Sequence, residues 1–154
     1  MTQDEVGMRA ALEMARKALE MGELPVGAAI FQGGTLISVG CNAREATHDP
    51  TAHAEIVAIR GAAQALGRWR LTDCTLYVTL EPCPMCAGAV VQARIARIVY
   101  GAEDARAGCT GSLYRLTEDP AFNHFAPADG GVLREACQEM LDRFFEARRA
   151  RPVS

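Results

Sequence analysis

The chain has 154 residues, 49% of them hydrophobic, which suits one folded domain with a buried core. Its formal net charge of −3 argues against broad binding to the phosphates of long nucleic acids, but not against a compact site for a short, unstacked loop. No apolar run approaches the roughly 20 residues of a membrane-spanning helix, and the acidic start is not that of a signal peptide. Six cysteines without such a signal predict reduced thiols and a cytoplasmic protein.

Apolar periodicity in the first part of the chain predicts two helices around a β-hairpin. The predicted elements are a helix over 4–21 that Gly22 ends, strands over 26–31 and 35–39 joined by Gly33-Gly34, a polar loop over 41–50 and a helix that begins at 49–51. In that second helix we expect Ile56, Val57 and Ile59 to point toward the core.

The rest of the chain alternates strands and helices and then loses its regular pattern. The predicted elements are a strand over 75–80, a helix that follows it through Ala93, a strand over 95–100, a loop-rich stretch over 102–128 with a short helix near 113–116, and a last helix over 132–150. A strand, a helix and a strand in short succession favour a parallel crossover. We therefore expect one domain over 1–154 of the α/β class, a three-layer α/β/α sandwich around a mixed sheet of about five strands.

The motif Pro-Cys-Pro-Met-Cys at 82–86 lies where the third predicted helix begins. Residues three apart share a helix face, so Cys83 and Cys86 point the same way. Pro82 and Pro84 suit a first turn, where a missing N–H costs nothing. The free N–H groups of that turn favour thiolates over thiols. The pair is therefore suited to bind a metal ion.

His53 can supply a third ligand, and Glu55 stands two residues after it. One His and two Cys leave a fourth zinc position open for water, as in catalytic sites. His-x-Glu followed by Pro-Cys-x-x-Cys is the signature of zinc-dependent nucleobase deaminases, in which the Glu is an acid and base and not a ligand. Residues two apart diverge on a helix, which also favours one ligand beside one non-ligand.

Other interpretations of these residues stay open. A Cys-x-x-Cys pair alone also suits a redox dithiol or a structural zinc site. The candidates for a fourth protein ligand are Cys41, Cys74, Cys109 and His48. None of them stands in a paired spacing with Cys83 or Cys86, which disfavours the closed structural site. The alternative for Glu55 is an acid that stabilises the start of a helix.

The predicted reaction is hydrolytic deamination. Zinc lowers the pKa of a bound water toward neutrality and so supplies a hydroxide that attacks an electron-poor ring carbon. Suitable targets are C4 of cytosine and C6 of adenine. Glu55 would take the water proton, pass it to the ring nitrogen and then protonate the leaving amine.

Further segments extend this motif match over about 49–149. They are 49–56, 75–89, 108–113, 122–124 and Phe144-Phe145 with Arg148-Arg149. In these segments the sequence resembles the bacterial tRNA-specific adenosine deaminases. The resemblance implies a cytidine-deaminase-like fold, one zinc ion per subunit and a homodimer whose interface lies near both active sites. It also implies conversion of adenosine to inosine at wobble position 34 in the splayed anticodon loop of a tRNA, expected to be an arginine tRNA.

The resemblance also assigns residues to the RNA. It implies that Asn42 hydrogen-bonds the target nucleotide. The residues implied in contacts with flanking nucleotides or the loop backbone are Asp104, Arg106, Asn123, His124, Phe144, Arg148 and Arg149. The ordinary alternatives are a turn for Asn42, a solvated loop for Asp104 and Arg106, packing for His124 and a helix C-terminus for Arg148 and Arg149. Of Phe144 and Phe145, one is expected in the core.

Two competing functions remain at this stage. A free-base or nucleoside deaminase for guanine or cytosine would share the chemistry but would not need the last helix or Asn123-His124. A noncatalytic nucleic-acid-binding module with structural zinc would not need Glu55. The cysteines without an assigned role are Cys41, Cys74, Cys109 and Cys137, and most are expected to be small core residues.

Overall fold

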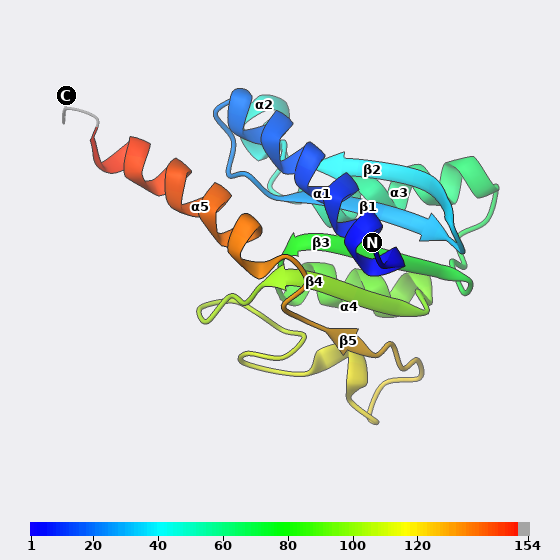
Figure 1. Ribbon diagram of the computed structural model, residues 1–154. Helices are drawn as coiled ribbons and strands as arrows, with labels where there is room; N and C mark the ends of the chain where they lie inside the picture. Colours follow the sequence, from blue (N-terminus) through cyan, green and yellow to red (C-terminus); the bar gives the residue numbers. More distant parts are fainter. Residues whose placement is uncertain (151–154) are drawn as a thin grey trace.

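A computed structural model describes residues 1–150 as a five-stranded sheet between two layers of helices (Figure 1). The strands are β1 (Gly27–Gln32), β2 (Thr35–Cys41), β3 (Cys74–Leu80), β4 (Arg97–Ala102) and β5 (Ala128–Asp129). The helices are α1 (Gln3–Glu20), α2 (Arg44–Thr47), α3 (Ala54–Leu66), α4 (Pro84–Ala93), the 3₁₀ helix η1 (Leu116–Glu118) and α5 (Arg134–Arg149). The strand order is β2-β1-β3-β4-β5.

The sheet is mixed, as predicted. β1 pairs antiparallel with both β2 and β3, whereas β3, β4 and β5 run parallel to one another. Gly33, at φ 59°, closes the β1–β2 hairpin in a conformation that glycine adopts without strain. The crossover from β3 through α4 to β4 brings the carboxyl ends of two parallel strands to the same edge of the sheet. Open α/β sheets place their sites at that edge.

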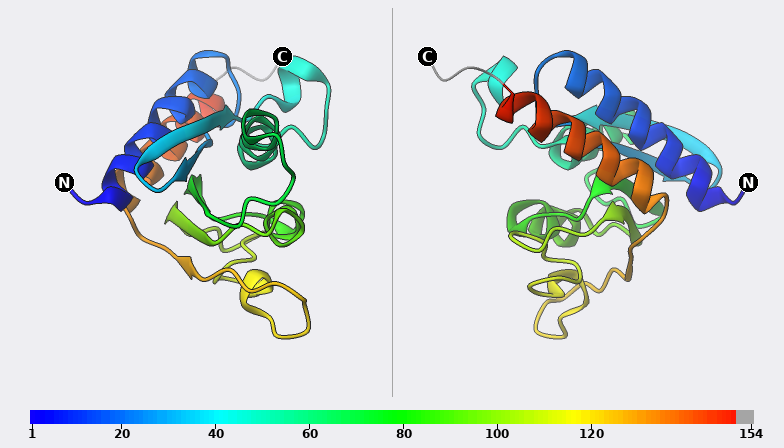
Figure 2. Two further views of the ribbon diagram at one scale, coloured as in Figure 1. Left: turned by 90° about the vertical axis from the view of Figure 1, so that its right-hand side faces the viewer. Right: turned by 60° about the vertical axis from the view of Figure 1, so that its left-hand side comes forward.

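Helices cover both faces of the sheet, which confirms the three-layer sandwich (Figure 2). α1 and α5 pack on one face, and α3 and α4 on the other. α1 turns its small apolar positions and Met8 inward, and the Thr2 side chain caps its start by accepting a hydrogen bond from the Glu5 N–H. None of the helices within residues 1–150 combines the length and the apolar composition needed to span a bilayer.

The second predicted helix begins later than expected. α3 starts at Ala54 rather than at 49–51, because Asp49 accepts hydrogen bonds from both the N–H and the hydroxyl of Thr51 and holds that stretch in a turn. His53 is therefore the residue that precedes the helix, with an extended backbone, and Glu55 lies in its first turn.

The inward face of α3 differs in part from the prediction. Its buried positions are Ala54, Glu55, Ala58 and Ala62, whereas Ile56, Val57 and Ile59 are only half-buried. Of these three, Ile59 packs against the core, as predicted. The reason for the difference is the close approach of α3 to β2. A Cβ on Gly40 would lie 2.4 Å from the carbonyl oxygen of Ala54, so only small residues fit between the two backbones.

Three short elements depart from the sequence prediction. α2 forms inside the stretch expected to be a loop, η1 lies at Leu116–Glu118 rather than near 113–116, and β5 was not predicted. Each has four residues or fewer, which is too short to show an apolar period. β5 exists because the edge of β4 is available for pairing, which is a tertiary condition.

Candidate metal centre and active site

The candidate site lies where α3 and α4 begin, at the carboxyl end of β3 (Figure 1). His53 immediately precedes α3 and Cys83 immediately precedes α4. Pro84 occupies the first turn of α4, where no backbone donor is lost, and Cys86 follows in the same turn. The free N–H groups and positive dipole ends of two helices thus act near one place, which stabilises negatively charged ligands.

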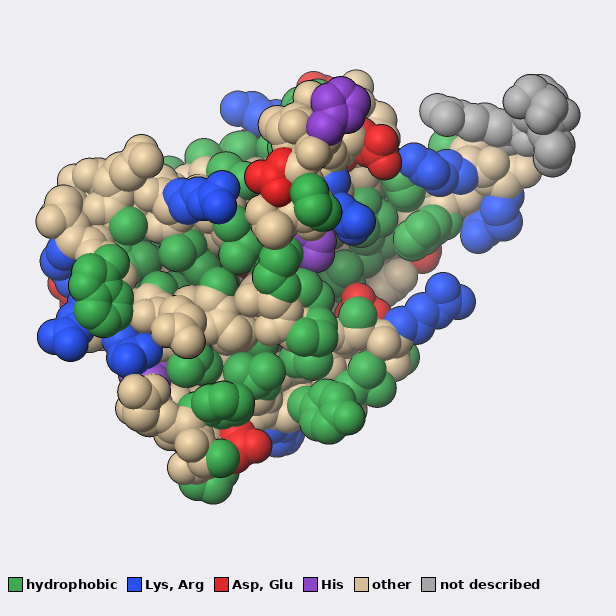
Figure 3. Space-filling view, turned by 180° about the vertical axis from the view of Figure 1, so that it is seen from behind, with side chains coloured by type: hydrophobic (Ala, Val, Ile, Leu, Met, Phe, Trp, Pro, Cys, Tyr) green, Lys and Arg blue, Asp and Glu red, His purple; other side chains and the backbone are tan. Residues whose placement is uncertain are grey.

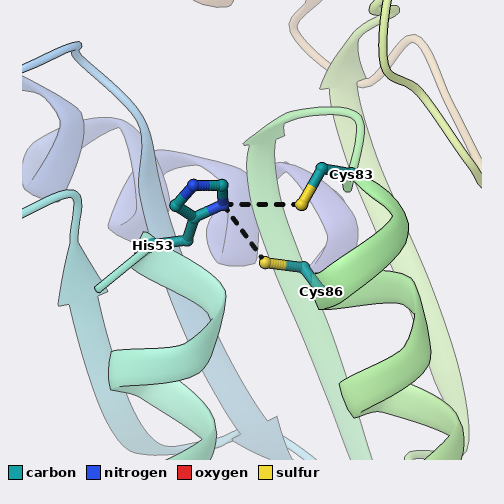
Figure 4. A group of neighbouring side chains, drawn as sticks. All are labelled: His53, Cys83 and Cys86. Carbon is teal, nitrogen blue, oxygen red and sulfur yellow. Dashed lines mark hydrogen bonds between the residues drawn. The ribbon is translucent and has the colours of Figure 1, made fainter. Parts of the chain in front are cut away.

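His53, Cys83 and Cys86 converge on one point (Figure 4). Nδ1 of His53 lies 3.5 Å from Sγ of Cys83 and 3.5 Å from Sγ of Cys86. All three ligand atoms lie within 4.8 Å of one another. Zinc bonds of about 2.0 Å to nitrogen and about 2.3 Å to sulfur, at a tetrahedral angle, place N and S about 3.5 Å apart. The residues therefore fit a zinc ion in both donor type and spacing.

The pKa values of the two thiols in this cluster shift in opposite directions. The Cys86 thiol, and then the His53 ring, hydrogen-bond to Cys83 and lower the pKa of Cys83 to about 4. The same contact raises the pKa of Cys86. The neighbouring Cys83 also raises the pKa of His53. Cys83 is therefore a thiolate at neutral pH, which is the form that binds a metal.

Glu55 lies beside the cluster and is 3% exposed. Its burial raises the pKa of this carboxyl to about 7. Glu55 lines the same cavity as His53 and Cys83 but is not part of the group of three converging ligand atoms. This placement leaves the carboxyl free to hold or move a proton next to a bound metal.

The cavity has a volume of about 140 Å³ and is lined mainly by apolar atoms with a few polar groups. Asn42, Arg44, Glu81 and Asp104 are the polar side chains that join the metal cluster and Glu55 around it. An apolar pocket with a small number of converging polar groups is the usual form of a small-molecule site.

Asn42 has an unpaired acceptor in this cavity. The residue is 7% exposed, and its Oδ1 has no hydrogen-bond partner within residues 1–150. Its Nδ2 donates only a long bond of 3.5 Å to the carbonyl of Leu24. Buried polar atoms in folded proteins are nearly always paired, so Oδ1 is suited to accept a hydrogen bond from a ligand.

A second, more open cavity of about 520 Å³ adjoins the first. The two share Leu24, Leu80 and Asp104 as common walls. The far side of the second cavity is α5, whose Phe145 and Arg149 face it, and Arg106 lines it from the loop after β4. We call this cavity the α5 groove.

The structure does not bring all the predicted RNA contacts to these cavities. Phe144 is buried, with the Arg148 guanidinium 4.5 Å from its ring centre, so Phe145 is the phenylalanine exposed to solvent. His124 bonds through Nε2 to the carbonyl of Ile95 at 2.7 Å, beyond the end of α4 that is remote from Cys83, and Asn123 is exposed beside it.

The residues that hold the walls of the site were not predicted from the sequence. Arg44 reaches the cavity because α2 is held in place by Glu23, a 2% exposed carboxylate that accepts hydrogen bonds from the N–H groups of Glu45 and Ala46. No pattern around Glu23 signals this long-range contact. Glu81, by contrast, lies inside the matched segment 75–89, but no role was assigned to it.

The sequence and fold match known deaminases. The family described as "Cytidine and deoxycytidylate deaminase zinc-binding region" matches residues 1–102. The tRNA-specific adenosine deaminase of Bacillus subtilis is 50% identical over 145 residues, which cover 94% of this chain and 90% of the relative. That of Haemophilus influenzae is 47% identical over 147 residues, covering 95% and 85%.

Solved structures agree with this match. A structure from a study of A-to-I editing by tRNA:A34 deaminases superposes with a TM-score of 0.85 at 42% identity, covering 88% of this chain and 99% of the other. A guanine deaminase from Nitrosomonas europaea is more distant, with a TM-score of 0.79 at 26% identity, covering 91% and 83%. The chain therefore belongs to the cytidine and deoxycytidylate deaminase zinc-binding family, and within it to the tRNA-specific adenosine deaminases.

Proposed function

We propose that this chain deaminates adenosine to inosine at wobble position 34 of tRNA. The observation that carries the proposal is the buried carboxyl of Glu55 beside three converging zinc-type ligands, in a cavity whose Asn42 acceptor is unpaired. The relatives named as tRNA-specific adenosine deaminases, up to 50% identical, support adenosine in tRNA as the substrate.

His53, Cys83 and Cys86 would hold one zinc ion per subunit, with a fourth position open. When bound, the ion would activate water by lowering its pKa toward neutrality. Glu55 would take one proton from the attacking water and deliver it to the ring nitrogen next to C6. It would then take the second proton of that water, now on the C6 hydroxyl, and deliver it to the departing amine. Water and adenosine thus become inosine and ammonia, and the carboxyl returns to its starting state.

Asn42 orients the target nucleotide. Its free Oδ1 accepts a hydrogen bond from the substrate, and the low dielectric of the cavity strengthens that bond. Asp104 and Arg44 are further polar side chains in the walls of the cavity. A substrate group that lacks the matching donor leaves a buried acceptor unpaired, which is a strong basis for specificity.

The α5 groove would take the nucleotides that flank the target. It opens from the same walls as the catalytic cavity and combines the exposed ring of Phe145 with the charges of Arg106 and Arg149. Aromatic rings and arginines are the groups on which unstacked bases and phosphates of a single strand bind. Arg148, packed over Phe144, would add positive charge in the last turn of α5 beside Arg149.

The remaining finer expectations belong to this proposal. Apolar side chains are spread over the face of the molecule seen in Figure 3, and they support a homodimer through that face. Asn123 and His124 would contact RNA only as part of such a dimer, because they lie away from the cavity of their own chain. Sedimentation equilibrium tests the dimer.

An arginine tRNA is the proposed substrate, and the cytoplasm is the proposed compartment.

Inosine formation is the test of the function. Zinc-loaded protein is incubated with an arginine tRNA anticodon stem-loop that carries adenosine at position 34, while free guanine, cytosine and adenosine are assayed in parallel. We expect inosine at the wobble position and no turnover of the free compounds. Turnover of a free base with an untouched stem-loop would keep the zinc chemistry and overturn the tRNA substrate.

A further inference from the structure

Glu81 is a buried carboxylate that the proposed chemistry does not use. It follows the last residue of β3 and precedes Pro82 and the metal ligand Cys83. Its exposed fraction is 2%. A buried carboxylate is costly unless hydrogen-bond donors surround it, so the donors around Glu81 indicate what it holds in place.

All of its partners belong to one loop, residues 103–112, which follows β4. Oε1 accepts a hydrogen bond from the N–H of Asp104 at 3.1 Å and another from the hydroxyl of Ser112. Oε2 accepts from the N–H groups of Thr110 at 3.1 Å and Ser112 at 2.8 Å. One carboxylate therefore binds both ends of the loop.

A backbone hydrogen bond also holds the loop against the turn that contains Glu81 and Pro82. The N–H of Cys109 donates to the carbonyl of Pro82 at 2.8 Å, one residue before the metal ligand. A Cβ on Gly108 would lie 2.3 Å from Cδ of Glu81, so the loop passes as close to the carboxylate as a glycine allows. The loop cannot shift without breaking the contacts of Glu81.

This loop forms one wall of the catalytic cavity. Asp104 and Ala107 line the cavity together with His53 and Glu55, and Asp104 is also shared with the α5 groove. The Asp104 carboxylate accepts hydrogen bonds from the N–H groups of Arg106 and Ala107 and so folds the wall into a tight turn. One of the N–H groups that Glu81 binds, that of Asp104, thus belongs to the first residue of that wall.

We infer that Glu81 is a positioning residue that sets the distance between the 103–112 loop and the metal-ligand turn, and thereby the orientation of the target base over the metal site. The inference rests on the proposed deaminase function of this cavity. It assigns no contact with the reacting atoms to Glu81. Misplacing a substrate by about 1 Å costs up to about 100-fold in rate, which is the scale of effect expected from such a residue.

Glu81→Gln makes a sharp test, because an amide offers one acceptor and one donor group where the carboxylate offers two acceptors. The hydroxyl of Ser112 can rotate to accept a bond, whereas a backbone N–H cannot. The amide NH₂ therefore takes the place of Oε1, facing Ser112, and the N–H of Asp104 loses its partner. The N–H groups of Thr110 and Ser112 keep theirs.

The experiment uses the zinc-loaded full chain and three measurements: amide hydrogen exchange by NMR, bound zinc, and kcat and KM separately. In Glu81→Gln we expect exchange at Asp104 to become about tenfold faster or more, with smaller changes at Thr110 and zinc content unchanged. We expect kcat to fall by about 10- to 100-fold. Ser112→Ala removes one of the four bonds and should shift exchange and kcat in the same direction by less.

Glu139→Gln, the same change at an exposed position on α5 whose partner is Arg143, is the control and should change none of the three quantities. Unchanged exchange at Asp104, loss of zinc, or fast exchange with normal kcat would each overturn the inference. If Glu81→Gln does not fold, Ser112→Ala decides the question by the same criteria. Kinetics are measured on whichever substrate the wild type converts, so a wild type that ignores the stem-loop refutes the tRNA proposal separately.

Discussion

Two buried polar side chains stand out at the scale of single residues. Glu55 is 3% exposed and Asn42 is 7% exposed, and Oδ1 of Asn42 has no hydrogen-bond partner among residues 1–150. Both line one cavity together with His53 and Cys83. Burial of polar groups costs stability, so their presence in one cavity indicates a site built for a polar ligand.

Glu55→Gln should remove turnover while leaving the metal in place. The amide cannot take a proton from water, so we expect kcat to fall by about 10²- to 10⁴-fold. Bound zinc should be unchanged because the proposed ligands are three other side chains. Zinc content and inosine formation are measured on the same preparation. Glu20→Gln, at an exposed position at the end of α1, is the control. Loss of zinc from the Glu55 variant would mean that this carboxyl is a ligand.

Asn42→Ala should lower kcat/KM for the substrate and leave the stability of the fold nearly unchanged. Its amide makes only one long bond, to Leu24, so the midpoint of thermal unfolding should change little. Loss of the acceptor should lower kcat/KM by about 10- to 100-fold, the size of one hydrogen bond in a buried site. A variant with a normal kcat/KM would show that Asn42 is no more than the turn residue after β2.

At the scale of helices and strands, the close backbone contact between α3 and β2 positions the site. α3 lies on β2 so closely that Gly40 faces the carbonyl of Ala54 and the N–H of Ala58. Since His53 and Glu55 stand at the start of α3, any displacement of that helix displaces the first metal ligand and the carboxyl together. The small residues along this contact thus serve the site as well as the core.

Gly40→Ala should destabilise the fold and weaken zinc binding. A Cβ at 2.4 Å from backbone atoms forces α3 away from β2, for which we expect a loss of about 1–3 kcal/mol in the free energy of unfolding. Zinc should also be lost at a lower chelator concentration. Gly34→Ala, in the hairpin turn where a Cβ meets nothing within 4 Å, is the matched control. Equal stability of the two variants in urea unfolding would contradict the prediction.

At the scale of the whole molecule, Arg97 links three parts of the chain that are distant in sequence: α1, β4 and β5. From β4 it donates to both carboxylate oxygens of Asp4 in α1, at 2.8 Å each, and to Asp129 in β5. The hydroxyl of Tyr77 in β3 also donates to Asp4. The hydrogen bonds from Arg97 lower the pKa of Asp4. This network fastens the first helix to the parallel half of the sheet.

Arg97→Gln should cost about 1–2 kcal/mol of unfolding free energy at pH 7, because charge-assisted hydrogen bonds are lost. The folded state lowers the pKa of Asp4, so this stabilisation is complete above the carboxyl's ordinary range. It is lost as the pH falls below about 4. Urea unfolding of wild type and variant at pH 7, 5 and 3 measures the difference, which should shrink at pH 3. A difference that is the same at pH 3 and pH 7 would contradict the assignment to Asp4.

Local patterns in the sequence determined the architecture and the candidate metal ligands of this protein. Apolar periods indicated α1, β1, β2, β3, α4, β4 and α5, and the spacing of Cys83 and Cys86 at a proline-marked helix start indicated a metal site. The predictions of the helices and strands succeed because each depends on residues a few positions apart. Only the tertiary structure decided the short elements, the buried face of α3 and the exposure of Phe145 rather than Phe144.

The walls of the site also required the tertiary structure. Glu81 holds a loop up to 31 residues away, through hydrogen bonds to backbone N–H groups. Glu23 holds α2 in the same way, through N–H groups 22 and 23 residues away. Every residue except proline offers such a donor, so no residue type in the loops marks the contact. The sequence alone specifies which side chains can bind the metal. The shape of the cavity around them is decided by buried carboxylates whose partners only the folded chain brings within reach.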